Sequence, residues 1–323
     1  MKKYLLKIFV FVIISYMIFF IGVQICSAGS SNLKFAQISD VHYSSSQKDT
    51  SYKLLSNSAQ LLDDAISQVN NACNIDFVMF TGDMINTPDE HELLRFIKHA
   101  NLLEKPWYAV FGNHDTACGA ALTKALYFDI LNGHNPNFCY KTPYYSFTPK
   151  KGYRVIALDT TIDYKTTCQG EVSEEQLEWL KDELDNSKND VVLIFMHVPL
   201  IEPYPNDSHK LVNGYDVKLL LKRYDNPIIV CSGHYHGTKI FQQTNILFVN
   251  TPSLVSFPNA FRIINVCPQR NKVVVDVYLK ETRLPELQEK SKNKSIGTLI
   301  LYGNEEDRTS TFVLPKKRDR NSI

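Results

Sequence analysis

The chain has 323 residues, of which 44% are hydrophobic and 21% are charged, with only 13 glycines and 14 prolines. This composition excludes a disordered or fibrous chain and predicts one large domain, or at most two. A formal net charge of +1, from 35 basic and 34 acidic residues, gives no whole-chain electrostatic reason to expect a nucleic-acid partner.

The first 28 residues have the three parts of an export signal. Three lysines precede an apolar stretch at 8–23, and small residues follow around Ala28. We interpret 1–28 as a signal peptide or as an uncleaved membrane anchor, because the apolar run is about long enough to span roughly 30 Å of hydrocarbon. Either alternative predicts a body outside the cytoplasm, in the periplasm, the cell envelope or the medium. Without those three lysines the body has 32 basic and 34 acidic residues, a net charge of −2.

Apolar strand-like runs alternate with helical patterns from residue 33 onward. Strands are predicted at 33–40, 75–83 and 106–115, and helices at 54–69 and 88–103, the latter with Pro88 in its first turn. Repeated strand and helix units of this kind predict a parallel sheet.

A loop-rich stretch at 116–142 follows, in which a Cys118–Cys139 disulfide is our best single guess for an exported chain. This stretch is interpreted either as a substrate lid or as a packed surface loop. Beyond it, strands are predicted at 153–159, 191–197 and 228–234, with helices at 173–184 and near 217–224 between them. Ser173 and Gln176 are expected to form a capping box at the start of the first of these helices. The rest of the chain is predicted to form a hairpin at 239–250, two strands within 261–279, a charged linker at 280–295 and short strands near 299–302 and 311–314.

Polar and ionisable side chains follow five of the predicted strands. The candidate metal ligands and catalytic residues are Asp40, His42, Asp83, Asn113, His114, Asp115, His197, His234 and His236. Ligands bind at the carboxyl ends of strands in open α/β sheets, so these groups are expected to converge. Carboxylate, amide and imidazole donors suit Mn, Fe or Zn, and a carboxylate between two sites can bridge two cations.

Each of these short motifs, taken alone, has a simpler interpretation. An Asp-x-His pair can be a solvated loop, Gly-Asp is ordinary turn chemistry, and Asn-His-Asp can cap a turn. The order of the blocks and their position after strands favour a common site.

The constellation DxH, GD, GNHD, a strand-terminal His and GHxH resembles the calcineurin-like metallophosphoesterase superfamily, over Lys34–Phe261. The segments GEVSEEQLEWL, HVPL and NTPSLVSF further resemble the branch of class III cyclic-nucleotide phosphodiesterases and purple-acid-phosphatase-like enzymes. The resemblance implies an α/β fold, a four-layered α/β/β/α sandwich with two mixed β-sheets flanked by helices. It also implies a metallophosphoesterase domain at 33–280, followed by a C-terminal extension at 281–323 with short strands and a basic tail.

The same resemblance assigns roles to the candidate residues. Asp40, His42 and His236 would hold one metal ion, Asn113, His197 and His234 the other, and Asp83 would bridge them. His114 would act near the leaving group, and Asp115 would orient its imidazole. The two ions, Mn, Fe or Zn, would generate a bridging hydroxide that attacks the phosphorus of a phosphomonoester or phosphodiester, cyclic or other nucleotides among them.

Two function classes follow. The first is a metal-dependent phosphoric ester hydrolase acting on a small phosphorylated substrate, with no evident nucleic-acid surface and with membrane contact only through the N-terminal segment. The second is a non-catalytic envelope protein that keeps the dimetal site for structure or binding. His209, in the polar segment after His197, is the candidate substrate contact. Sequence motifs for NTPases, dinucleotide oxidoreductases and serine hydrolases are absent.

Overall fold

Buried apolar runs form two six-stranded sheets in the computed structural model, which describes residues 32–316. The first sheet has the order β12-β11-β10-β1-β2-β3. Its strands are β1 (Leu33–Ile38), β2 (Phe77–Thr81), β3 (Trp107–Val110), β10 (Ala260–Pro268), β11 (Lys272–Glu281) and β12 (Thr309–Pro315). Strands β1, β2 and β3 run parallel, as the repeated strand and helix pattern predicted, and the other neighbours in this sheet pair antiparallel.

The second sheet has the order β4-β5-β6-β7-β9-β8 and is also mixed. Its strands are β4 (Tyr145–Phe147), β5 (Tyr153–Ala157), β6 (Val191–Phe195), β7 (Ile228–Ser232), β8 (Lys239–Gln243) and β9 (Ile246–Asn250). The central strands β5, β6, β7 and β9 are parallel, whereas β4 and β8 pair antiparallel at the two edges. The expected β8–β9 hairpin is therefore confirmed.

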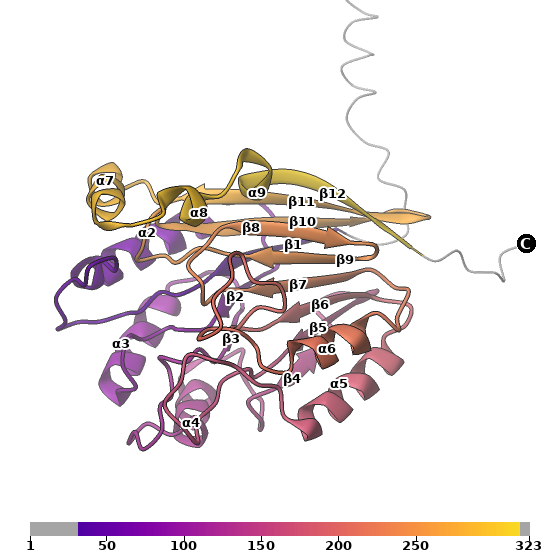
Figure 1. The fold of residues 1–323 in the computed structure, drawn as a ribbon, viewed down its shortest axis with the longest axis horizontal. Helices are drawn as coiled ribbons and strands as arrows, with labels where there is room; N and C mark the ends of the chain where they lie inside the picture. The colour runs from indigo at the N-terminus through magenta and orange to yellow at the C-terminus, as the bar shows by residue number, and fades with distance from the viewer. Residues whose placement is uncertain (1–31, 317–323) are drawn as a thin grey trace, which may run out of the picture.

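Helices cover the outer faces of both sheets (Figure 1). The helical segments are η1 (Leu55–Asn57), α2 (Ser58–Asn70), α3 (Glu90–Ala100), α4 (Lys124–His134), α5 (Glu174–Asn186), α6 (Gly214–Leu221), α7 (Pro285–Lys294), α8 (Thr298–Tyr302) and α9 (Glu305–Arg308). Alternation along β6 shows the layering, since Leu193 and Phe195 belong to the large core between the sheets, whereas Val192 and Ile194 pack toward α5 and α6. The predicted four-layered sandwich is confirmed.

Several local expectations are corrected. Helix α3 begins after Asp89, whose side chain accepts a hydrogen bond from the Glu92 amide, so Pro88 precedes the helix instead of lying in its first turn. Ser173 caps α5 by accepting from the Gln176 amide, but the Gln176 side chain does not close a capping box. It bonds both backbone groups of Asp159 at 2.8 Å.

The middle and the C-terminus contain helices where loops or strands were expected. The stretch read as loop-rich contains α4, and most of the charged linker forms α7. The run at 299–302 lies in α8 and is not a strand, whereas 311–314 lies in β12 as predicted. Cys118 and Cys139 are exposed free thiols, so the guessed disulfide is not formed.

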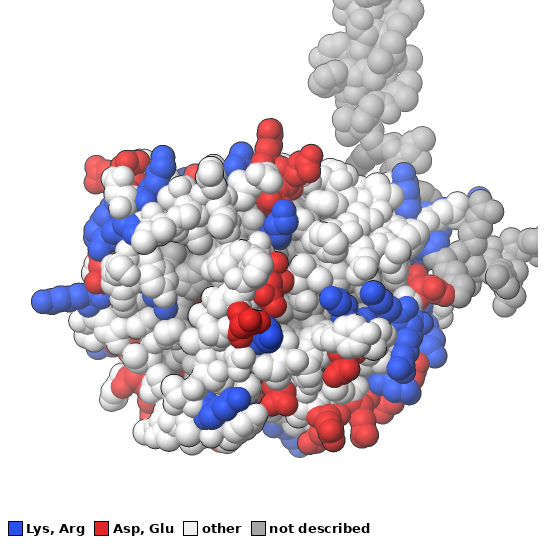
Figure 2. Space-filling model, viewed as in Figure 1, with Lys and Arg blue, Asp and Glu red and all other residues white. Residues whose placement is uncertain are grey.

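The proposed leader at 1–28 and most of the basic tail lie outside the described residues. Within 32–316, no helix has both the length and the apolar character that crossing a membrane requires. On the face drawn in Figure 2, acidic and basic side chains are interspersed, with uncharged surface between them.

Candidate metal centre

The predicted ligands converge where strands of both sheets end. Asp40 and His42 follow β1, Asp83 follows β2, and Asn113 and His114 follow β3, all in the first sheet. From the second sheet come His197 after β6, and His234 and His236 after β7. The Asp40, His42 and His197 side chains are fully buried, and Asp83 is 2% exposed. Residues almost two hundred positions apart thus share one small interior site.

Three groups of His and Asp side chains lie close enough to hold metal ions. The groups are Asp40, His42 and His236; His42, Asp83 and His114; and Asp83, His197 and His234, with the candidate ligand atoms of each group within 4.8 Å of one another. The first matches the set expected for one ion. The third matches the other set except for Asn113, whose Oδ1 lies 3.1 Å from His197 Nε2.

Asp83 stands between the two groups. Its Oδ1 lies 3.4 Å from His197 Nε2, and its Oδ2 lies 3.5 Å from His42 Nε2. One carboxylate therefore presents one oxygen to each group. This is the geometry that a bridging ligand requires.

The imidazoles are arranged as metal ligands would be. The Nε2 atoms of His42 and His236 face each other at 3.2 Å, and His234 Nε2 is buried without a hydrogen-bond partner among the described residues. Two ring nitrogens at such a distance cannot both carry protons, so at least one of them presents a lone pair that could bind a cation. His197 Nδ1 lies 2.8 Å from the Thr81 carbonyl, which directs its Nε2 into the site.

Left-handed backbone is concentrated at these positions. Asp40, His42, Asp83, His234 and His236 have φ between 40° and 72°. Such conformations cost about 1–3 kcal/mol each for residues with a side chain, and they persist where the surroundings enforce them. The turns after β1, β2 and β7 therefore store strain to aim these side chains inward.

Glycines in the motifs allow the close approach of these turns. A methyl group at Gly112 would overlap the backbone nitrogen and Oδ1 of Asp83, and one at Gly233 would overlap Ser39 Oγ and Asp40 Oδ2. The glycines of GNHD and GHYH thus make room for the carboxylates of the other two blocks.

The buried charges shift the pKa values of Asp83, His197 and His234 in different directions. Burial raises the pKa of Asp83, but the histidines around it outweigh burial and hold this pKa well below its usual range. Burial lowers the pKa of His197, but Asp83 and Asp40 outweigh it and raise the pKa to about 9. Burial and His197 together lower the pKa of His234 to about 3, so its ring is neutral and able to bind a cation.

The expected pairing of His114 with Asp115 is corrected. His114 Nδ1 lies 2.7 Å from the carbonyl oxygen of Asn86. The Asp115 carboxylate instead accepts backbone hydrogen bonds from Ile85 at 3.0 Å and from Gly112 at 2.8 Å. Because a carbonyl only accepts, Nδ1 carries the proton and Nε2 is the unprotonated nitrogen of the neutral His114 ring. Asp115 shapes the GNHD turn, and burial together with Asp83 raises its pKa to about 8.

Lys53 is a member of the site that the sequence did not reveal. Its Nζ lies 3.3 Å from His42 Nδ1 and 3.4 Å from His114 Nε2. Burial and the Asp83 carboxylate act in opposite directions on His114, and with the Lys53 charge the net effect lowers the pKa of His114. No motif marks Lys53, because a lysine in a polar loop before a helix usually extends into solvent.

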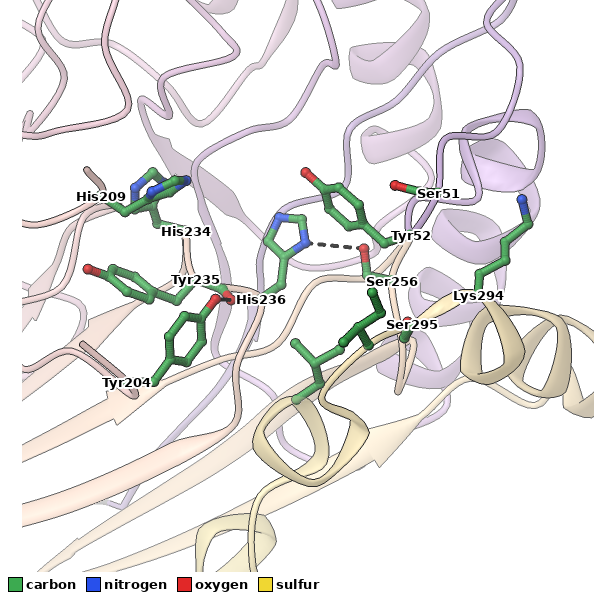
Figure 3. A pocket seen from close by; sticks show the side chains of 12 residues that line it. Ser51, Tyr52, Tyr204, His209, His234, Tyr235, His236, Ser256, Lys294 and Ser295 are labelled. Carbon is green, nitrogen blue, oxygen red and sulfur yellow. Dashed lines mark hydrogen bonds between the residues drawn. The ribbon is translucent and has the colours of Figure 1, made fainter. Parts of the chain in front are cut away.

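A cavity of about 270 Å³ opens beside His234 and His236 (Figure 3). Its lining residues are Ser51, Tyr52, Tyr204, His209, His234, Tyr235, His236, Ser256, Lys294, Ser295, Ile296 and Leu301. His209 thus lies beside the centre as expected, with its ring centroid 5.1 Å from that of His234. Nothing from 116–143 lines this cavity, and Tyr127 and Phe128 are buried in the core, so that stretch packs against the fold and is not a lid over this cavity.

Comparison with known proteins agrees with this geometry. The family model for calcineurin-like phosphoesterases matches residues 33–238. The chain is 27% identical over 223 residues to a probable glycerophosphodiester phosphodiesterase of Arcobacter nitrofigilis, covering 67% of this chain and 77% of that protein. It is 24% identical over 259 residues to a probable cyclic nucleotide phosphodiesterase of Coxiella burnetii, covering 77% and 89%.

A solved structure supports the fold. The crystal structure of a dimetal phosphatase from Danio rerio superposes with a TM-score of 0.60 at 18% sequence identity. The match covers 75% of this chain and 95% of the Danio rerio chain.

Proposed function

The chain belongs to the calcineurin-like phosphoesterase family, and on this premise we propose that it hydrolyses phosphomonoesters or phosphodiesters outside the cytoplasm. The observation that carries the proposal is Asp83, which presents one carboxylate oxygen to each of two ligand groups. Two cations held there would neutralise the phosphoester oxygens and lower the pKa of the attacking water.

The residues of this chain would divide the remaining work. Asp40, His42 and His236 form one ligand set, Asn113, His197 and His234 the other, and Asp83 joins the two. Thr81 and Ser256 orient two of the imidazoles, through His197 Nδ1 at 2.8 Å and His236 Nδ1 at 3.1 Å. His114 has its Nδ1 held by the Asn86 carbonyl, so its Nε2 is the atom that would face the leaving oxygen, and it would have to carry a proton to donate to that oxygen.

The neighbouring cavity supports a substrate with an uncharged, ring-sized organic group. Tyr52, Tyr204 and Tyr235 contribute aromatic surface, and Leu301 contributes an aliphatic wall. Lys294 is the one Lys or Arg among the described lining residues, and its Nζ donates to the Thr50 carbonyl at 3.1 Å. With no uncommitted Lys or Arg to receive a second phosphate there, we expect diphosphates to be poorer substrates than simple phosphoesters.

The proposed location rests on the leader at 1–28. A lysine-rich start followed by an apolar stretch and small residues is typical of export signals. Cell fractionation, together with the N-terminal sequence of the purified protein, tests the location and separates a cleaved leader from a retained anchor. Detection of the intact chain in the cytoplasm alone would contradict it.

The activity is tested by a substrate screen on residues 29–323 loaded with Mn or Fe. Aryl phosphate monoesters and diesters, cyclic nucleotides, nucleoside monophosphates, lipid phosphates and pyrophosphates are compared, with the metal content measured in the same sample. Two bound ions with turnover of an ester support the proposal. Two bound ions without turnover across the panel would favour a non-catalytic envelope protein.

A further inference from the structure

Lys53 is a buried cation whose side chain ends inside the candidate metal centre. It is only 4% exposed, although it lies in the loop that precedes η1. Its backbone amide donates to Thr50 Oγ1 at 2.9 Å, and its carbonyl accepts from the Thr50 amide at 3.0 Å. The next amide, of Leu54, donates to the Val255 carbonyl at 2.8 Å. These bonds fix the backbone on both sides, so the inward direction of the side chain is built into the loop.

The neighbours of the Lys53 ammonium are rings and not carboxylates. Nζ contacts His42 Nδ1 at 3.3 Å and His114 Nε2 at 3.4 Å, and the ion pairs formed within residues 32–316 do not include Lys53. Asp83 and Asp40 attract it only at longer range, against the burial that lowers its pKa. A buried charge is costly without an opposite charge in contact. Metal ions bound by those two aspartates would neutralise them, so Lys53 would need an anion from elsewhere.

We propose that Lys53 is a further catalytic residue, whose ammonium donates a hydrogen bond to a phosphoryl oxygen of the substrate on the side of the centre where His114 lies. An ammonium has three N–H donors, and two ring nitrogens lie within its reach, so at least one donor remains for a ligand. Charge that builds on the phosphoryl oxygens during the reaction strengthens this contact, which makes it a contribution to rate as well as to binding. The role involves no bond formation and no proton transfer at Nζ.

The inference rests on the proposed phosphoester function, and inorganic phosphate is the probe that separates the two. Affinity of the metal-loaded protein for phosphate is measured by calorimetry for wild type, Lys53→Met and Lys53→Arg, with the metal content of each determined. We expect Lys53→Met to keep both ions and to bind phosphate at least about tenfold more weakly, since a unit charge is removed at close range. Lys53→Arg should recover most of the affinity because it restores the charge.

Lys290→Met is the matched control. Lys290 lies in α7, has 43% of its side chain exposed and pairs with Asp49 at 2.8 Å, so its loss should leave phosphate affinity unchanged. If Lys53→Met does not fold, Lys53→Gln replaces it under the same criteria. Three results would overturn the inference. The first is an uncharged variant that binds phosphate as tightly as wild type, and the second is a Lys53→Arg variant that is weakened as much as the uncharged variant. The third is that the wild-type protein binds no phosphate.

The charge of the substrate gives a second test, in which the ratio of kcat/KM for two esters would not change if Lys53 had only a structural role. An aryl phosphate monoester is a dianion and the corresponding diester a monoanion, so loss of a cation should reduce kcat/KM for the monoester by a larger factor, about tenfold more. Equal losses on both esters would contradict a direct contact with the phosphoryl group. Phosphate binding without turnover of any ester by wild type would instead refute the proposed function and leave the phosphate comparison to judge Lys53.

Discussion

The Nε2 atoms of His42 and His236 lie 3.2 Å apart, although the two residues are separated by 194 positions in the chain. His42 follows a strand of the first sheet and His236 a strand of the second. An ion held between them would therefore connect the two sheets. We expect chelation to lower Tm, since a ligand present at a hundred times its Kd stabilises the folded state by about 2.7 kcal/mol. Calorimetry with and without chelator checks this, and an unchanged Tm would contradict a metal at this junction.

Asp83 is predicted to be indispensable for both ions. Asp83→Ala removes the oxygen beside His42 and the oxygen beside His197 at once, so elemental analysis should find both ions lost together with most of the activity. Asp63→Ala serves as the control, because Asp63 is half exposed and pairs with His99 away from the centre. An Asp83→Ala protein that still carries two ions would refute the bridging role.

His114 is predicted to act on rate and not on metal content. His114→Ala should keep the fold and both ions, and should lose about 10² to 10⁴ in rate, as expected for a group that assists a leaving oxygen. Steady-state kinetics with elemental analysis measures both quantities. Full activity in this variant would remove His114 from the mechanism.

Asp115→Ala is the informative comparison for His114→Ala. Because the Asp115 carboxylate holds the amides of Ile85 and Gly112, its loss leaves two buried donors unsatisfied, at about 1–3 kcal/mol each in the free energy of unfolding. Denaturant unfolding should detect this loss, whereas His114→Ala should be nearly neutral in the same experiment. A fully stable Asp115→Ala would show that the turn does not depend on the carboxylate.

Metal binding is predicted to release protons. In the metal-free protein the pKa of His197 is raised to about 9, because Asp83 and Asp40 outweigh the effect of burial. His197 is thus protonated near neutral pH and must lose its proton before it binds a cation. Metal affinity should therefore rise as the pH increases toward 9. Calorimetric titration with metal in buffers of different ionisation enthalpy measures the protons released, and release of none at pH 7 would contradict the prediction.

The cavity beside the centre is predicted to select for the organic group of the ester. Tyr204→Ala should lower kcat/KM for an aryl diester by several-fold, consistent with about 0.5–1.5 kcal/mol for an aromatic contact, with a smaller effect on a methyl ester. Leu301→Asp should act in the same direction because it places a negative charge beside an anionic substrate. Tyr215→Ala, at a tyrosine that is 68% exposed and outside the cavity, is the control. Equal losses on both esters would indicate a general defect.

The sequence predicted the ligands better than their surroundings. Asp40, Asp83 and His197 were recognisable because each follows a buried apolar run. Such a run predicts a strand, and the carboxyl ends of strands in α/β sheets are where ligands bind. The position of Asp115 depends on how the turn at 112–115 closes, which spacing does not determine. The direction of Lys53 likewise depends on a loop held by Val255, about two hundred residues away.

Local sequence patterns predicted the wrong secondary structure in two segments. Asn132 and Gly133 lie near the end of helix α4 and Asn135 follows it, and these residues favour a loop. Burial of Tyr127 and Phe128 nevertheless makes the segment helical. The apolar run at 299–302 is too short for its periodicity to separate strand from helix. Neither error touched the candidate metal ligands, because these follow strands whose apolar runs are long and flanked by turns, although Leu301 of α8 does line the neighbouring cavity.

The position of the centre between the two sheets also sets the order in which the protein matures. Neither of the two expected ligand sets is complete until β7 and the turn that carries His234 and His236 have been made and placed beside the first sheet. An ion can therefore find a complete ligand set only after that turn has been made and placed. If the leader sends the chain across a membrane before it folds, the identity of the ions is decided by the medium in which folding ends and not by the one in which the chain is synthesised.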